Sequence, residues 1–119
     1  MYVGLTVCLF ACESDEPPMG CGVGRPAEEL AWLREDIQQK EASPEEYTKY
    51  QHIAQAEYEG STVFLYLNCD PSANSVVQVF DCGGEQVGIL GDREGDVPFS
   101  MLVNATTLWR SEDSECQRL

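Results

Sequence analysis

Two β-branched and aromatic stretches near the middle of the chain dominate its hydrophobic pattern. They cover residues 62–69 and 76–82, and a short polar linker separates them. Side chains of this kind fill the pleated, buried surface of a sheet. The pattern therefore predicts two antiparallel neighbours at the centre of a β-sheet.

The region before these strands has the pattern of helices. Apolar side chains recur at helical spacing over residues 26–41, after a proline that suits a first turn. The buried face of this predicted helix carries Leu30, Leu33 and Ile37. Ser43-Pro44-Glu45-Glu46 then has the order of an N-cap and capping box, which predicts a second, short helical segment from Pro44 to about Tyr50.

Further extended segments surround the central pair. Glu59-Gly60 and Gly83-Gly84 are two-residue turn sequences, so residues 53–58 and 85–90 are expected to form hairpins with the central strands. A short strand or turn is expected at residues 100–103, and a last strand at residues 106–110. The predicted fold class is α+β, with one or two N-terminal helices packed on an antiparallel β-meander of about four to five strands.

The register of the central pair predicts two apolar faces. A hairpin centred on the linker places Phe64 opposite Val79 and Tyr66 opposite Val77. One face then carries Phe64, Tyr66, Val77, Val79 and Leu90, and the other Val63, Leu65, Leu67, Val76, Phe80, Val87 and Ile89. Because one helix covers a single face, we expect the C-terminal strand with Trp109, or a curl of the sheet, to cover the second, in preference to a partner protein.

The charge balance narrows the range of partners. The 119 residues are enough for one domain, and 21 acidic against 7 basic residues give a formal net charge of −14. This balance argues against nucleic acid, since phosphate binding needs clustered lysine and arginine. It is compatible with a basic protein partner or with a solvated acidic surface.

The first residues have the composition of a secretion signal. Residues 1–11 are uncharged and mostly apolar, but they are too few to cross a bilayer about 30 Å thick. Leu9-Phe10-Ala11-Cys12 resembles the bacterial lipobox, in which the cysteine is diacylated on its sulfur and the peptide is cut just before it, whereas Cys8 follows the larger Val7 and fits less well. No basic residue precedes the apolar run, so the true translation start is expected upstream.

An acidic tether is expected to follow the anchor. Residues 12–25 are rich in acid, proline and glycine, which predicts a flexible link between lipidated Cys12 and a single globular domain at residues 26–119. The run Glu13, Asp15 and Glu16 resembles the signal that sends some lipoproteins to the outer surface. The predicted location is the bacterial outer membrane, facing the periplasm or the surface, with acyl chains as the membrane contact.

Six cysteines in a short chain indicate an oxidising compartment. With Cys12 lipidated and Cys8 cut away, the disulfide candidates are Cys21, Cys69, Cys82 and Cys116. In the predicted hairpin Cys69 and Cys82 lie more than about 20 Å apart, so they are not expected to bond to each other. Two pairings stay open, namely Cys21–Cys69 with Cys82–Cys116, and Cys21–Cys82 with Cys69–Cys116.

Few residues have the pattern of a reactive or metal-binding site. His52 is the only histidine, and we expect a structural ring with satisfied hydrogen bonds or an exposed one. Asp92, Glu94 and Asp96 share one loop and are weak calcium candidates, although Gly95 stands in the wrong place for an EF-hand. No catalytic residue, resident metal or cofactor is predicted, and a solvated loop is the simpler interpretation.

Four short motifs follow one another along the chain. They are Leu30-Ala31-Trp32-Leu33, Tyr58-Glu59-Gly60-Ser61-Thr62-Val63-Phe64, Val79-Phe80-Asp81-Cys82-Gly83-Gly84 and Thr107-Leu108-Trp109. Over roughly residues 28–110 the chain resembles a group of small secreted bacterial lipoproteins with an uncharacterised domain. It departs from them at Ala31, where members have proline, and at Cys82-Gly83-Gly84, where members have Cys-Asp-Gly. It also lacks a cysteine that members often carry just after that turn. The resemblance implies an envelope lipoprotein and supplies no activity.

The function expected from the sequence is a lipid-anchored binding or structural module of the cell envelope, not an enzyme. The alternative is an inhibitor of a basic envelope-directed enzyme, a lysozyme or a protease, because the small braced domain is strongly acidic. A hydrolase that uses His52 is the least favoured hypothesis.

Overall fold

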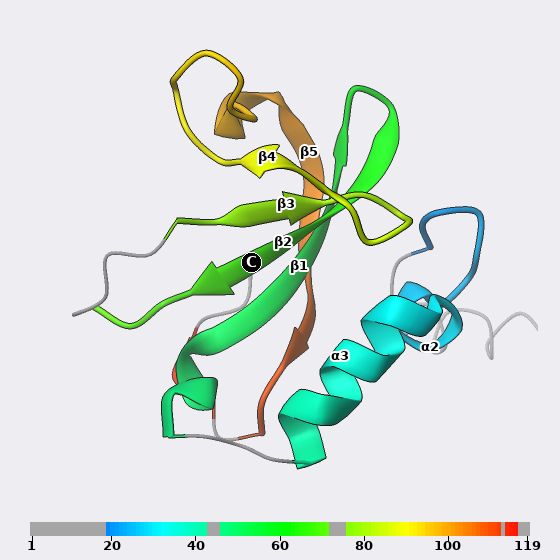
Figure 1. Ribbon diagram of the computed structural model, residues 1–119, viewed down its shortest axis with the longest axis vertical. Helices are drawn as coiled ribbons and strands as arrows, with labels where there is room; N and C mark the ends of the chain where they lie inside the picture. The colour runs from blue at the N-terminus through cyan, green and yellow to red at the C-terminus, as the bar shows by residue number, and fades with distance from the viewer. Residues whose placement is uncertain (1–18, 43–45, 72–75, 113, 117–119) are drawn as a thin grey trace, which may run out of the picture.

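The computed structural model describes residues 19–42, 46–71, 76–112 and 114–116 (Figure 1). Its helical elements are α2 (Pro26–Glu29), α3 (Ala31–Ala42) and the 3₁₀ helices η1 (Glu46–Tyr50) and η2 (Phe99–Met101). Its strands are β1 (Gln51–Tyr58), β2 (Ser61–Asn68), β3 (Gln78–Phe80), β4 (Gln86–Ile89) and β5 (Leu102–Arg110). The predicted α+β class, with helices packed on an antiparallel meander, is confirmed.

The sheet follows the chain for four strands and then turns back. Its order is β4-β3-β2-β1-β5, and all neighbours are antiparallel. Glu59 and Gly60, between β1 and β2, have φ values of 54° and 83°, the left-handed pair that a type I′ hairpin requires. Helix α3 lies across one face of the curled sheet (Figure 1).

The helical region differs from its prediction in two ways. The single helix expected over residues 26–41 is divided, because Leu30 adopts an extended conformation with φ −88° and ψ 114°. The predicted buried face of the helix is confirmed at Leu33 and Ile37, whose side chains are only 0% and 8% exposed. The second helical segment is the 3₁₀ helix η1, and Pro44, where it was expected to begin, lies outside the described residues.

The predicted register of the central pair is wrong by one residue. Phe64 pairs with Phe80 and Tyr66 with Gln78, instead of with Val79 and Val77. A one-residue slip moves every side chain of β3 to the other face. The observed register is favoured by aromatic packing on the helix side, where Phe80 lies 4.9 Å from Tyr66 and 6.3 Å from Trp32 between ring centroids.

The second face of the sheet is closed by the curl of the sheet and by the loop after β4, and not by Trp109. Trp109 packs on the helix side, beside Ile53 and Phe64. The other face buries small and aliphatic side chains that include Ala54, Ala56, Val63, Leu65, Val79 and Val97. The sheet curls over this cluster, and Val97 reaches it because its N–H donates to the Ile89 carbonyl at 2.8 Å. Of the expected covers, the structure shows the curl of the sheet, to which the loop after β4 adds Val97.

The last strand is longer than predicted. Residues 100–103 and 106–110 were expected to be separate segments, but β5 runs without a break from Leu102 to Arg110. Asn104, between the two expected segments, lies at an irregularity, where it has a φ of 57° and the pairing with β1 shifts. A bulge therefore accommodates the sequence that had indicated a gap.

Gly84 provides a test of how closely the helix packs on the β3–β4 turn. Its φ is +86°, and an added Cβ would lie 2.9 Å from a ring carbon of Trp32. We expect Gly84→Ala to lower the free energy of unfolding by about 2 kcal/mol or more, from backbone strain and the clash together. Urea unfolding followed by circular dichroism measures this loss.

Gly95→Ala is the matched control for this variant. Gly95 has a φ of +91°, but an added Cβ there meets nothing within 4 Å. Its substitution isolates the strain, at about 1–2 kcal/mol. An equal loss in the two variants would show that Trp32 does not press on Gly84.

Candidate functional site

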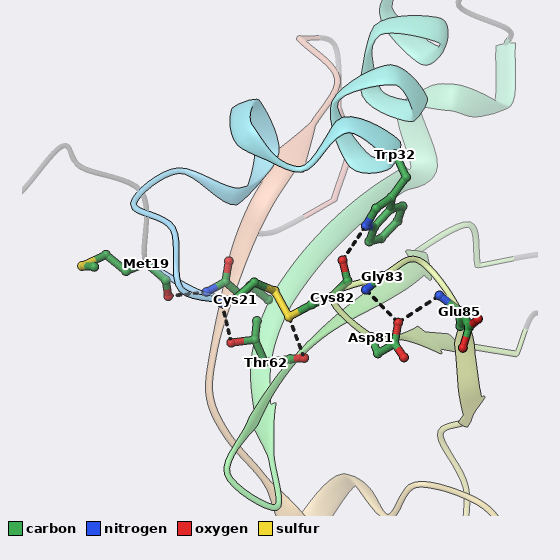
Figure 2. Close-up of a disulfide and its surroundings, with 9 residues drawn as sticks. Met19, Cys21, Trp32, Thr62, Asp81, Cys82, Gly83 and Glu85 are labelled. Carbon is green, nitrogen blue, oxygen red and sulfur yellow. Dashed lines mark hydrogen bonds between the residues drawn. A yellow bond between two sulfur atoms is a disulfide. The ribbon is translucent and has the colours of Figure 1, made fainter.

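One disulfide joins the segment before α2 to the end of β3. Cys21 lies at the tip of a tight turn in which Gly20 and Val23 exchange backbone hydrogen bonds of 3.0 and 2.9 Å. This turn brings its sulfur to Cys82, with the α-carbons 5.7 Å apart (Figure 2). The N–H of Cys21 also donates to the Thr62 hydroxyl at 3.1 Å. The covalent bond and the hydrogen bond therefore fix this segment to the sheet.

The ordered structure thus begins before the predicted domain boundary. Residues 19–25 were assigned to a flexible tether, but the Gln55 side-chain amide donates to the Met19 carbonyl at 2.8 Å, and Cys21 is covalently bound. The acidic and proline-rich residues that suggested a tether are concentrated in residues 13–18, and these lie outside the described residues, as does Cys12.

The second disulfide joins Cys69, just after β2, to Cys116 near the end of the chain, with the α-carbons 5.8 Å apart. Together the bonds make one of the two pairings that the sequence left open. They close loops of 61 and 47 residues in sequence separation. In the chain-entropy account, loops of this size contribute roughly 4 kcal/mol each to stability.

His52 is buried in the sheet at the same end as the second disulfide. It is 6% exposed and pairs across the strands with Arg110. Its Nδ1 atom has no hydrogen-bond partner among the described residues, which differs from the satisfied or exposed ring that was expected. Burial, and to a lesser extent the charge of Arg110, lower the pKa of His52. The ring is therefore neutral at physiological pH, and this nitrogen activates no serine or cysteine in the described part of the chain.

A network of polar side chains on the helix side was not predicted. The Tyr66 hydroxyl donates to Asp36 at 2.5 Å, and the Lys40 ammonium lies 3.9 Å from the same carboxylate. Burial, followed by the hydrogen bond to Asp36, raises the pKa of Tyr66. The sequence contained one indication of this network, because Asp36 and Lys40 are one helical turn apart and can form an ion pair. The hydrophobic pattern did not identify Tyr66 as their partner on the strand.

Two hollows flank Lys40. The larger, about 510 Å³, is lined by Lys40, Glu41, Thr48, Trp109, Arg110, Ser111 and Glu112. The smaller, about 300 Å³, is lined by Lys40, Gln51, His52, Ile53, Tyr66, Leu67, Asn68, Val76 and Gln78. Both have mixed polar linings suited to binding polar groups. Neither brings a nucleophile to the unpartnered nitrogen of His52.

The loop with Asp92, Glu94 and Asp96 supplies no calcium cage. Within the described residues, no group of three or more histidine, cysteine, aspartate or glutamate side chains is placed to hold a metal ion. Asp96 instead accepts a hydrogen bond from the Arg93 N–H at 3.1 Å, within its own loop.

The titration of His52 predicts a pH effect on stability. Because its folded pKa lies below the ordinary value of 6.5, the unfolded chain binds more protons once the pH falls toward and below that value. The stability contributed by neutral His52 is therefore present above about pH 6.5 and is lost as the pH falls. We expect the free energy of unfolding of the wild type to decrease relative to that of His52→Gln between about pH 7.5 and 5.

Urea unfolding of both proteins at a series of pH values measures this difference. Carboxylates titrate in the two proteins alike, so their effect cancels in the comparison. Parallel curves for the wild type and His52→Gln would contradict a lowered pKa at this residue.

Comparison with known proteins identifies no relative. The chain matches no protein-family model, no curated protein and no solved structure. None of the helices in the described part of the chain is both long and apolar enough to cross a membrane.

Proposed function

We propose that this protein is a lipid-anchored binding or structural module of the bacterial cell envelope, not an enzyme. The observation that carries the proposal is the pair of disulfides, each of which ties a segment outside the sheet to a strand end. Such bonds persist in oxidising compartments outside the cytoplasm. The Leu9-Phe10-Ala11-Cys12 sequence adds a means of attachment to the outer membrane, facing the periplasm or the surface.

The arrangement of the domain is compatible with attachment at one point. The Cys21–Cys82 bond holds the N-terminal segment on the sheet, so a short link from Cys12 would keep the whole domain close to the membrane surface. Two acyl chains or more would make this attachment durable, at about 0.8 kcal/mol for each buried methylene.

Metabolic labelling with a fatty-acid analogue tests the anchor. The full reading frame is expressed in a bacterial host, and the labelled protein is detected on a gel. We expect label on the wild type and none on Cys12→Ser. Cys8→Ser is the matched control and should keep the label, because Val7 precedes Cys8 where a small residue is needed. An unlabelled wild type, or label that survives Cys12→Ser, would reject the anchor.

A second candidate function is inhibition of a basic envelope-directed enzyme, such as a lysozyme or a protease. The observation that favours it is the position of several acidic residues at one end of the domain. Glu57 and Glu59 lie at the β1–β2 turn, and Asp92, Glu94 and Asp96 lie in the loop after β4 (Figure 1). Such a surface attracts a positively charged enzyme at a rate that salt reduces.

An inhibition assay tests this second function. We expect the full chain to reduce the activity of a strongly basic lysozyme at low salt and to lose this effect at high salt. The charge-reversed variant Glu57→Lys with Glu59→Lys should inhibit less at low salt. Inhibition that changes neither with salt nor with charge reversal would show that the acidic residues at this end do not cause it.

A further inference from the structure

Strand β5 forms an open edge of the sheet. Among the described residues it has a strand partner only on its β1 side. The backbone groups of residues 103–106 make no hydrogen bond to a described residue outside that pairing. The outward row of N–H and C=O groups is therefore available to a further strand.

Two of the usual protections against other chains are absent from most of this edge. Exposed edge strands are commonly guarded by charged side chains or by proline within the strand. Residues 99–109 contain neither, although about a quarter of the whole chain (24%) is charged, and Pro98 and Arg110 stand only at the two ends of this segment. The bulge at Asn104 is the one protective feature within it. Three apolar side chains in this segment are instead exposed to solvent, with exposed fractions of 69% for Phe99, 47% for Met101 and 51% for Val103. An exposed group of this kind indicates a contact surface.

Acidic residues lie on both sides of this uncharged segment. Glu57 pairs with Val103 across the strands, and Glu59 follows Tyr58, which pairs with Leu102. The loop before η2 contributes Asp92, Glu94 and Asp96, with Arg93 as its one basic residue. In Figure 1 the β1–β2 turn and this loop extend at the same end of the molecule, on either side of the start of β5. An apolar centre with a charged rim is the usual anatomy of a protein interface.

The charge decides which partner this edge fits. A second copy could in principle add its own β5, but each copy has a net charge of −14, and their acidic rims would face each other. A segment rich in lysine or arginine would instead place opposite charges against the same rims. Backbone hydrogen bonds to the edge would supply affinity, and alternate side chains would contact the apolar residues.

We propose that the outer edge of β5, with the exposed side chains of Phe99, Met101 and Val103, is a docking surface for an extended segment of a basic protein. The inference rests on the proposed binding role and is independent of the lipid anchor. A failure here leaves the fatty-acid labelling result unaffected, and an unlabelled protein leaves this surface intact.

A short peptide of alternating lysine and valine is a direct probe of this edge. The full oxidised chain in detergent micelles is titrated with the fluorescent peptide, and a peptide of alternating glutamate and valine serves as the comparison. We expect binding of the lysine peptide at low salt, weaker binding at high salt, and none of the glutamate peptide. Hydrogen exchange should show new protection of the backbone amides in residues 103–106.

Two matched variants separate the edge from general charge effects. Val103→Lys adds a positive charge to β5 and should weaken binding about tenfold or more. Val87→Lys makes the same change on the opposite edge strand, where the side chain is 44% exposed, and should change the affinity less than about twofold. Equal weakening by the two variants would overturn the proposal, because the effect would then come from net charge alone.

The acidic rim is tested without any change to β5, which keeps the proposal testable if Val103→Lys unfolds. Glu57→Gln with Glu59→Gln should weaken the binding of the lysine peptide several-fold, whereas Glu35→Gln with Glu85→Gln, on α3 and the β3–β4 turn, should not.

Two further results would overturn the proposal. One is the absence of binding to the lysine peptide at low salt. The other is a dimer, detected by light scattering, that Val103→Lys dissociates, because the occupant would then be a second copy.

Discussion

The pairing of Phe64 with Phe80 determines the arrangement of the helix side of this domain. In that register Phe64, Tyr66 and Phe80 face α3, and the Trp32 ring packs edge-on against Phe64 at 5.7 Å between centroids. The Trp32 indole N–H then reaches the Cys82 carbonyl at 2.8 Å (Figure 2). A slip of one residue would remove Phe80 from this cluster and replace it with valine side chains.

The same pairing places the β3–β4 turn where the N-terminal segment can be bonded to it. Cys82 lies two residues after the end of β3, and Asp81 orders the turn by accepting hydrogen bonds from the N–H groups of Gly83 and Glu85 at 2.9 and 3.0 Å. Two contacts therefore hold the same turn. The Cys21–Cys82 bond joins it to the N-terminal segment, and the Trp32 indole joins it to α3. Because these contacts share residues, we expect their contributions to stability to be coupled and not additive.

Local patterns predicted the elements better than the contacts between them. The Glu59-Gly60 hairpin and the buried Leu33 and Ile37 follow from turn chemistry and helical spacing, which are properties of neighbouring residues. The β2–β3 register depends on packing against Trp32, a residue distant in sequence, so it could not be derived from the strands alone. The two disulfide pairings likewise differed only in tertiary geometry. For the same reason the Asp36–Tyr66 hydrogen bond was missed, and the exposed edge of β5 was not recognised from its sequence.

Three of the seven basic residues lie near one end of the domain, where acidic residues accompany them, and the net acidic charge bears on how the edge of β5 can persist in solution. Lys40, Lys49 and Arg110 lie near the end that carries η1 and the second disulfide, and the β1–β2 turn extends at the opposite end (Figure 1). Sheets that expose a long uncharged edge tend to pair with copies of themselves. A net charge of −14 opposes that association without placing a charge on residues 102–109 of the strand. Protection by net charge is selective, because it repels acidic chains, including other copies, and does not repel a basic one.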